Sequence, residues 1–379
     1  MDPRKHFIGQ LRRYRRGSVS RRQFLGVTGL GAAVTTLAAA MPELLPRRAS
    51  AAPLGDRVSL ATWPNYHDPR NFDRFTAETG VKVEVAVFGS NEEMAAKLRA
   101  GAAGWDVFVP SSYALEGYAA AGLIEPLDLG LIPMYDPASY SDPRFARAGM
   151  VDGKVYAVQK DWGTTGYCVN TAKVPERLAS WKDFWDLARG KYAKRATVLD
   201  DQLAAIGNAL KYYGYSFNAV DPKQLEDAEK LLLDAKPHLL GITLDLQPAV
   251  RNGEAWLAMA ATGDARQLHR DIPAIAYVIG RDGGEIWSDG YAVPRAAPHR
   301  AAGHALINFL LAPENNRNEV LAHGYPVADK RVLDLLPPEM LQDSIMFPAA
   351  ELLSPLEFAA AVALTNPTRA EIMARFKAA

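Results

Sequence analysis

Cysteine is almost absent from the 379-residue chain, which contains Cys168 alone. A disulfide within the chain is therefore excluded, and so is a structural metal site built on several thiolates. No cysteine stands at the end of the N-terminal segment to accept a lipid, so we expect no lipid anchor. Cys168 is flanked by Tyr167 and Val169 in an apolar run, where we expect it to be an inert part of the core.

An excess of charge of either sign is also missing, because 43 Lys and Arg residues balance 43 Asp and Glu residues. A balanced chain has no electrostatic footprint for nucleic acid or for an anionic membrane surface. We therefore expect no nucleic-acid partner. Any selectivity for charge must be local to a binding site.

The usual catalytic signatures are missing as well. The sequence has no HExxH helix, GxSxG elbow or P-loop, and its seven histidines show no metal-ligand spacing. The adjacent acids Asp200 and Asp201 would point to opposite faces if they lay in a strand. We therefore expect a protein that is not an enzyme and that holds no metal and no cofactor. An exported cofactor enzyme is the competing class.

A hydrophobic run long enough to span a membrane is lacking at the N-terminus. The mildly apolar stretch 26–40 is shorter than the roughly 20 residues that a spanning helix needs. It follows a basic start and the sequence SRRQFL at 20–25, which matches the twin-arginine export pattern. We predict that residues 1–51 are a twin-arginine signal peptide, read by the twin-arginine export machinery, and that the mature protein is periplasmic. The alternative is an uncleaved N-terminal anchor.

Alternating strand and helix patterns follow in the rest of the chain. We predict strands at 58–63, 81–87, 105–109 and 196–199, and helices at 72–80, 91–98, 222–233 and 301–311, with a further helix beginning after Ser180. Strict alternation at 81–87 predicts that Val81, Val83, Val85 and Val87 form one buried face. This order of elements indicates an α/β fold with a mostly parallel sheet. No single linker divides the chain, so we expect it to cross between two domains more than once.

A series of short motifs runs through the mature chain in a fixed order. They are TWPNY at 62–66, FTAETGVKV at 75–83, SNEEMAAKL at 90–98, DVFVPSSY at 106–113, WGTTG at 162–166, SWKD at 180–183, DD at 200–201, WSD at 287–289, LINFLL at 306–311 and GYP at 324–326. Together they resemble the spermidine/putrescine-binding proteins of bacterial ABC importers. Each motif alone is a weak signal, whereas their collinear order over nearly the whole mature chain is a strong one.

The resemblance implies a two-lobe periplasmic binding protein fold of type II, with the ligand cleft between the lobes. Lobe 1 would comprise 56–161 plus 287–328, and lobe 2 would comprise 162–286 plus 329–379. The implied function is capture of a putrescine- or spermidine-like cation by lobe closure, followed by delivery to an ABC transporter permease in the inner membrane. We expect the protein to be a monomer.

Ammonium groups are bound by carboxylates and by the faces of aromatic rings. The resemblance assigns ligand binding to Trp63, Tyr66, Ser111, Tyr113, Asp201, Trp287, Asp289 and Tyr325, and Asp264 resembles the acid of the putrescine-selective members. Trp287 and Asp289 are spaced by one residue and would share a strand face. The other positions have structural alternatives: Trp63 could be core, Tyr113 and Tyr325 could serve packing, and Asp201 and Asp264 could cap helices.

Three positions depart from the family pattern. Ala204 stands where the spermidine binders carry a glutamate, Ala261 replaces a tryptophan wall, and Pro64 stands where the family uses Thr or Ser. A missing carboxylate leaves an ammonium without its counter-charge, which costs several kcal/mol when the group is buried. The ligand could therefore be shorter, bulkier at one end or singly charged. A second hypothesis on the same fold is a different solute, such as an amino acid derivative, an opine or a sugar.

Overall fold

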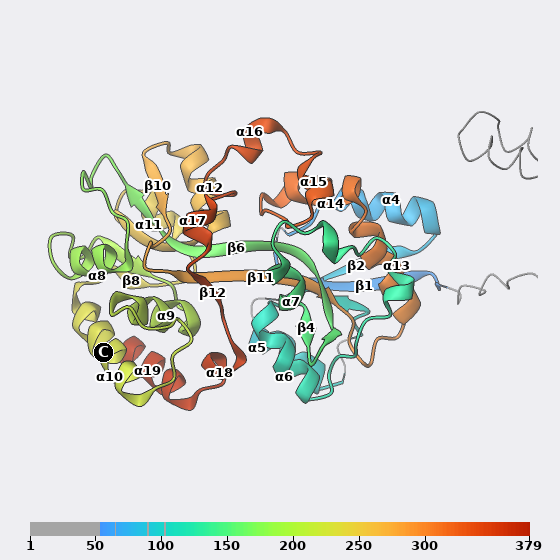
Figure 1. Cartoon of the computed structure of the whole chain (residues 1–379), viewed down its shortest axis with the longest axis horizontal. Coiled ribbons are helices and arrows are strands. Elements are labelled where there is room, and N and C mark those ends of the chain that lie inside the picture. Colours follow the sequence, from blue (N-terminus) through green and yellow to red (C-terminus); the bar gives the residue numbers. More distant parts are fainter. Residues whose placement is uncertain (1–53, 65, 89–90, 102–103) are drawn as a thin grey trace, which may run out of the picture. The chain divides into compact units, whose positions relative to one another are not determined.

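Strands from widely separated parts of the sequence join one ten-stranded sheet (Figure 1). The computed structural model describes residues 54–64, 66–88, 91–101 and 104–379. The predicted signal peptide, 1–51, lies outside the described residues. In the part of the chain that is described, no helix is both long and apolar enough to cross a membrane.

The strands are β1 (Arg57–Thr62), β2 (Lys82–Val87), β3 (Val107–Phe108), β4 (Met150–Val151), β5 (Lys154–Val155), β6 (Ala157–Asn170), β7 (Ala196–Val198), β8 (Gly241–Ile242), β9 (Leu257–Ala261), β10 (Ile275–Val278), β11 (Gly284–Ala292) and β12 (Leu356–Phe358). The helices are α4 (Pro69–Thr79), α5 (Asn91–Arg99), α6 (Leu115–Ala120), α7 (Pro143–Ala148), α8 (Trp181–Arg189), α9 (Gln202–Tyr212), α10 (Pro222–Ala235), α11 (Gln247–Arg251), α12 (Thr262–Asp271), α13 (Arg300–Leu310), α14 (Pro313–His323), α15 (Lys330–Leu333), α16 (Pro338–Leu341), α17 (Ala350–Leu353), α18 (Ala361–Leu364) and α19 (Pro367–Ala378). Short 3-10 turns include η1 (Ser112–Ala114).

The strand order is β2-β1-β3-β11-β6-β9-β7-β8, with β10 also paired to β6 and β12 to β11. Strand β1 is parallel to β2 and β3, and β7 is parallel to β8 and β9. The antiparallel pair β6–β11 joins these two parallel groups, and Figure 1 shows both strands running between them. Two strands, and not one linker, therefore connect the two ends of the sheet.

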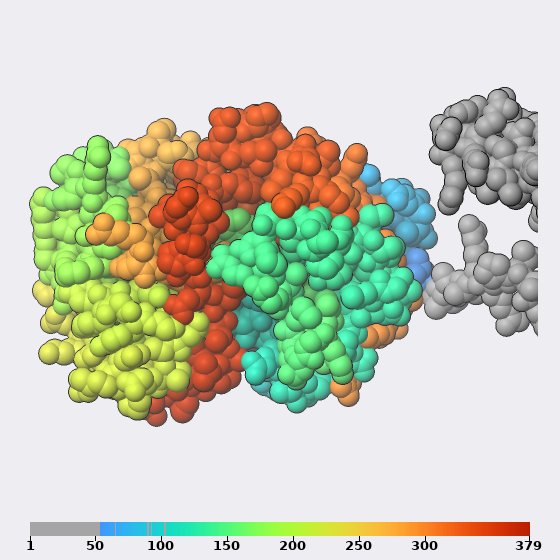
Figure 2. All heavy atoms as spheres, viewed as in Figure 1, coloured from blue at the N-terminus to red at the C-terminus, as the bar shows by residue number. Residues whose placement is uncertain are grey.

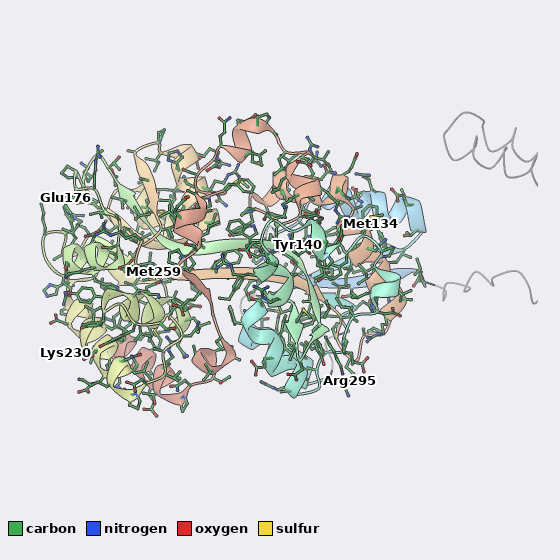
Figure 3. All side chains as sticks on the ribbon, in the orientation of Figure 1. Met134, Tyr140, Glu176, Lys230, Met259 and Arg295 are labelled. Atoms are coloured by element: carbon green, nitrogen blue, oxygen red, sulfur yellow. The ribbon has the colours of Figure 1, made fainter. Side chains whose placement is uncertain are left out.

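Each parallel group has a hydrophobic core of its own. Around β7 and β9, the aromatic residues Trp181, Phe184 and Trp185 of α8 are fully buried beside α9, α10 and α12. A second core forms where α4 and α13 pack against β1 and β3. Figure 3 shows Met259 of β9 inside the first group, whereas Lys230 lies at its periphery. The two cores give each end of the sheet its own stabilisation.

Local signals in the sequence position several helix ends. Ser180 caps α8 by accepting a hydrogen bond from the backbone N–H of Asp183, as the motif at 180–183 predicts. Helix α4 ends at Gly80, which adopts the left-handed conformation with φ 76°. These caps confirm the predicted start of α8 and the predicted end of α4, whereas α4 begins at Pro69, three residues before the predicted start.

One predicted burial pattern is wrong. Val85 is 49% exposed and Val87 is 55% exposed, although the alternation at 81–87 predicts that both face the core. Strand β2 is the edge strand of the sheet and pairs only with β1 among the described strands. Alternation therefore predicts the strand correctly but not how much of its face other elements cover.

The core around β9 yields a stability prediction. Leu257→Ala should lower the free energy of unfolding by about 2–5 kcal/mol, because the fully buried side chain leaves a cavity. Urea denaturation followed by circular dichroism measures the change. Leu244→Ala is the matched control: Leu244 is 62% exposed, and its loss should change stability by less than about 0.5 kcal/mol. Equal effects in the two variants would contradict the assigned core.

Candidate ligand-binding site

One face of β11 carries Glu285, Trp287 and Asp289, which alternate along the strand. Both acids are 5% exposed. In the register of β6 with β11, Asp161 stands directly opposite Asp289. Residues opposite each other in an antiparallel pair share a face, so the two carboxylates lie on the same side of the sheet. The strands that join the two ends of the sheet thus present three buried acids.

A β-bulge adds a cation to this group. Asp289 pairs with Asp161 and Gly290 pairs with Gln159, so Lys160 is an extra residue on β6. Neighbouring residues in a regular strand point to opposite faces. The bulge changes that direction, and Nζ of Lys160 lies 3.1 Å from Oδ2 of Asp161. Because Lys160 is 1% exposed, this is a fully buried ion pair.

Tyr66, in the loop after β1, bridges the two opposed aspartates. Its hydroxyl group lies 2.5 Å from Oδ1 of Asp161 and 3.0 Å from Oδ2 of Asp289. The ring centroid lies 5.5 Å from that of Tyr325, and Nζ of Lys160 lies 4.2 Å from the Tyr66 centroid. The phenol therefore links the loop after β1 to both crossing strands.

Aromatic rings continue the wall beside Asp289. The rings of Trp287 and Tyr325 meet edge to face with their centroids 5.4 Å apart. A Cβ atom at Gly163 would lie 2.3 Å from the indole of Trp287, and one at Gly263 would lie 2.2 Å from the hydroxyl group of Tyr325. Glycine at these two positions therefore leaves space for the rings. The result is an indole and two phenols around the acids.

The loop before α6 reaches the same acids. The backbone of Ser111 forms an isolated β-bridge with Asp289. The side-chain amide of Asn91 donates a hydrogen bond to the hydroxyl group of Tyr113 at 2.8 Å. Burial raises the pKa of Tyr113 well above its usual value, and the nearby carboxylates of Asp201 and Glu285 raise it further. Ser111 and Tyr113 thus belong to the same electrostatic neighbourhood as Asp289.

Burial raises the pKa values of all three acids, Asp161, Asp289 and Glu285. Burial raises the pKa of Asp289 to about 7, and the carboxylate of Asp161 contributes to the rise. Burial and then the charge of Asp201 raise the pKa of Glu285 to about 8. Glu285 also accepts a hydrogen bond from the hydroxyl group of Thr165 at 2.6 Å. Near neutral pH, both carboxyl groups are therefore close to their titration points.

The remaining predicted residues have local structural partners. The indole N–H of Trp63 donates to the backbone oxygen of Val109 at 3.0 Å, and the ring packs against Phe88 beside the second core. Asp201 caps α9, because its carboxylate accepts a hydrogen bond from the N–H of Ala204 at 2.7 Å. The structural alternatives proposed for Trp63 and Asp201 therefore describe real contacts.

Asp264 is not a helix cap. It lies in the first turn of α12, and its carboxylate accepts a hydrogen bond from the side chain of Gln247 at 2.7 Å. Its charge is one of those that raise the pKa of Tyr325, so it lies near the aromatic wall. Asp200, the neighbour of the cap residue Asp201, forms an ion pair with Lys377 at 2.7 Å. The two neighbouring aspartates thus have separate roles.

Sequence reasoning missed several members of the group. Glu285 could have been found, since it continues the alternation of Trp287 and Asp289 by one step. Lys160 and Asp161 gave only a weak signal, as a charged pair within an otherwise apolar strand. In the described part of the chain, no group of three or more His, Cys, Asp and Glu side chains is arranged to hold a metal ion. The chemistry of the site is that of buried acids and aromatic rings.

Comparison with known proteins assigns the chain to a protein family. The family described as bacterial extracellular solute-binding protein matches residues 71–348. The chain belongs to this family. Solute binding is not catalysis, so the expectation that the protein is not an enzyme is confirmed.

Individual relatives agree with the family. A protein of Escherichia coli named spermidine/putrescine-binding periplasmic protein is 32% identical over 293 residues, which are 76% of this chain and 82% of the relative. The putrescine/agmatine-binding protein of Pseudomonas aeruginosa is 29% identical over 314 residues, covering 79% and 85%. A crystal structure of a spermidine/putrescine ABC transporter substrate-binding protein from Streptococcus pneumoniae superimposes with a TM-score of 0.76 at 26% identity, covering 85% of this chain and 99% of that one. The predicted periplasmic binding protein fold is confirmed.

The protonated state of Glu285 yields a prediction for stability against pH. A carboxyl group whose pKa is higher in the folded than in the unfolded state stabilises the fold at low pH, and this contribution is lost as pH rises from about 4.5 to 8. Glu285→Gln should therefore gain at least about 1 kcal/mol relative to the wild type over that range. Thermal unfolding of the ligand-free protein at several pH values measures the difference.

The control for this prediction has the opposite sign. Glu357 bonds Lys211 at 2.5 Å, and its pKa is lowered, although burial opposes the change. Its carboxylate therefore stabilises the fold at higher pH, and Glu357→Gln should lose stability relative to the wild type as pH rises through the acidic range. Parallel trends in the two variants would contradict the proposed protonation of Glu285.

Proposed function

We propose that the protein is the periplasmic substrate-binding component of an ABC importer and that it captures a cation resembling putrescine or spermidine. The observation that carries the proposal is the state of Asp289. Its carboxylate is buried among aromatic rings, and its Oδ1 atom has no hydrogen-bond partner among the described residues. The names of the relatives from Escherichia coli and Pseudomonas aeruginosa support a polyamine ligand.

The chemistry of this group favours an ammonium ligand. A buried carboxylate without a partner is costly, and an ammonium group would supply both a charge and hydrogen-bond donors. The faces of Trp287 and Tyr325 would attract the same cation through their quadrupoles, at about 0.5–2 kcal/mol each. The proposed binding site also includes the other residues that the family resemblance assigns, which are Trp63, Tyr66, Ser111, Tyr113, Asp201 and Asp264.

Ligand access in the proposal requires the two lobes, 56–161 plus 287–328 and 162–286 plus 329–379, to separate. Most of the site is buried, so a solute cannot enter without movement. Figure 2 shows a furrow between the red segment of β12 and α18 and the teal segment around α6. The crossing strands β6 and β11 would serve as the hinge, because they are shared by both ends of the sheet. Twin-arginine export and a monomeric state belong to the same proposal and rest on the sequence.

The departures from the family pattern bear on the size and the charge of the proposed ligand. Ala204 is 2% exposed in α9, and Ala261 ends β9 beside Thr165. Neither supplies the carboxylate or the indole that the family uses there. We therefore propose a ligand with fewer charges than spermidine, such as putrescine, cadaverine or agmatine.

Replacing the central acid tests the proposal. Asp289→Asn should weaken the binding of the preferred diamine more than tenfold, because the ammonium loses its counter-charge while the shape of the side chain is kept. Isothermal titration calorimetry with putrescine, cadaverine, agmatine and spermidine measures the affinity. Asp221→Asn is the control, since Asp221 caps α10 at the surface and asparagine also caps helices. The proposal would be defeated if the wild-type protein bound none of these four cations.

Closure yields a separate prediction. Saturating diamine should reduce the radius of gyration of the wild-type protein in small-angle scattering, because the two lobes approach each other around the ligand. The same diamine should leave the radius unchanged for Asp289→Asn at a concentration that does not saturate the variant. A ligand that binds tightly without changing the scattering curve would contradict the hinge motion.

A further inference from the structure

Lys160 is an unexpected neighbour for a site that takes up cations. Its Nζ atom lies 3.1 Å from Asp161, 3.8 Å from Glu319 and 4.2 Å from the ring centroid of Tyr66. A resident ammonium therefore occupies the kind of environment that a ligand ammonium would seek. The bulge in β6 places it there, since a regular strand would point Lys160 away from Asp161.

Burial raises the pKa of Asp161, whereas the charge of Lys160 and the hydrogen bonds around the carboxylate favour its ionised form. It accepts from the hydroxyl group of Tyr66 at 2.5 Å and from Lys160 at 3.1 Å. The Nε2 atom of His323 lies 3.6 Å from the same carboxylate. The backbone N–H of Tyr325 donates to Nδ1 of His323, so the neutral imidazole carries its proton on Nε2, facing Asp161. Each oxygen of Asp161 thus has one donor, the Tyr66 hydroxyl group at Oδ1 and Lys160 at Oδ2, and both favour the ionised form.

The hydroxyl group of Tyr66 makes two contacts but has a single proton. It donates that proton to Asp161, and it also lies 3.0 Å from Oδ2 of Asp289. A single proton can serve both contacts only as a bifurcated hydrogen bond, whereas a proton on Asp289 would give each contact a donor of its own. Burial raises the pKa of Asp289 to about 7, which agrees with this assignment. Protonation of Asp289 would therefore satisfy both contacts of the Tyr66 hydroxyl group.

The other charged groups near Asp289 have partners or lie further along the site. Glu319 of α14 contacts Nδ1 of His67 at 2.6 Å and accepts from the amide of Asn71 at 2.7 Å. Glu285 is bonded to Thr165 and is the other carboxyl group with a strongly raised pKa. Asp201, which caps α9, and the phenols of Tyr113 and Tyr325 are further titratable groups that face this region. Glu285 and Asp161 are therefore the rival sources of a proton that an experiment must separate.

A small cavity adjoins Asp289. It is lined by Ser112, Gln159, Ser288 and Gly290 together with Asp289 and apolar residues of α6 and α7. Polar lining on this side offers hydrogen-bonding groups to water.

We propose that Lys160 determines which carboxylate the ligand meets: it occupies Asp161, so that a single ammonium enters at Asp289 in exchange for the proton of that residue. The inference rests on the proposed function and deepens it. In the exchange, the O–H bond of Asp289 breaks, the proton passes to solvent, and the carboxylate pairs with the incoming ammonium. The net charge of the site stays constant, which favours one ammonium at this end over two.

Proton release on binding tests the inference. Calorimetric titration of the wild type with putrescine, in two buffers with different ionisation enthalpies, should show release of about one proton per ligand at pH 6 and little release above pH 8. The affinity should rise by roughly tenfold per pH unit below pH 7 and then level off. Binding without proton release at pH 6 would overturn the inference and leave the proposed function intact. The proposed function itself fails if neither putrescine nor any other cation binds.

Variants identify the source of the proton and the role of Lys160. Lys160→Met keeps the shape of the side chain but removes the charge from Asp161, which should then take the proton itself. Proton release at pH 6 should fall to less than half of the wild-type value. The variant Lys160→Met/Asp161→Asn should show the same loss without leaving an unpaired acid in the interior, which guards against misfolding of the single variant.

Two further variants are controls. Lys211→Met/Glu357→Gln removes a partly buried ion pair between α9 and β12, away from the site, and should keep wild-type proton release. Glu285→Gln should keep it as well, because the proton comes from Asp289. Loss of release in Glu285→Gln, or full release in both Lys160 variants, would overturn the inference.

Discussion

The antiparallel pairing of β6 with β11 is the constraint on which the rest of the site depends. It joins two parallel groups of strands that have separate cores, and it sets Asp161 opposite Asp289. Tyr66, which lies 95 residues before Asp161 in the sequence, then bridges the two carboxylates. A change of register by one residue would turn every side chain of β11 to the other face. The same pair of strands therefore joins the two ends of the sheet and positions the candidate site.

Burying this many acids requires compensation within the fold. An isolated buried carboxylate costs several kcal/mol, and a protein reduces this cost by pairing, hydrogen bonding or protonation. The chain uses all three: Lys160 pairs with Asp161, Tyr66 donates to it, and Asp289 and Glu285 retain protons near neutral pH. The charges of the acids are thus compensated in part by groups of the fold itself. A cationic ligand would replace part of this internal compensation with its own charge.

Local sequence patterns predicted much of the fold and part of the site. Alternation and caps located β1, α4 and α8, and spacing by one residue placed Trp287 and Asp289 on a common face. The same reasoning failed for Val85 and Val87, because the covering of an edge strand depends on elements distant in sequence. The position of Lys160 depends on a bulge, which is a property of two paired strands. Local patterns in a single sequence do not show which residues pair across long sequence separations.

The two ends of the acidic face limit what a ligand can be. Glu285 and Asp289 are four residues apart on β11, so their backbones are separated by roughly 13 Å. Asp201, held in place as the cap of α9, adds its charge at the Glu285 end. A ligand with a single ammonium would satisfy Asp289 and leave Glu285 protonated, whereas one with two ammonium groups could reach the second acid only through a chain of several methylenes. Charge spacing along one strand, and not the number of acids alone, therefore sets the selectivity that such a site can achieve.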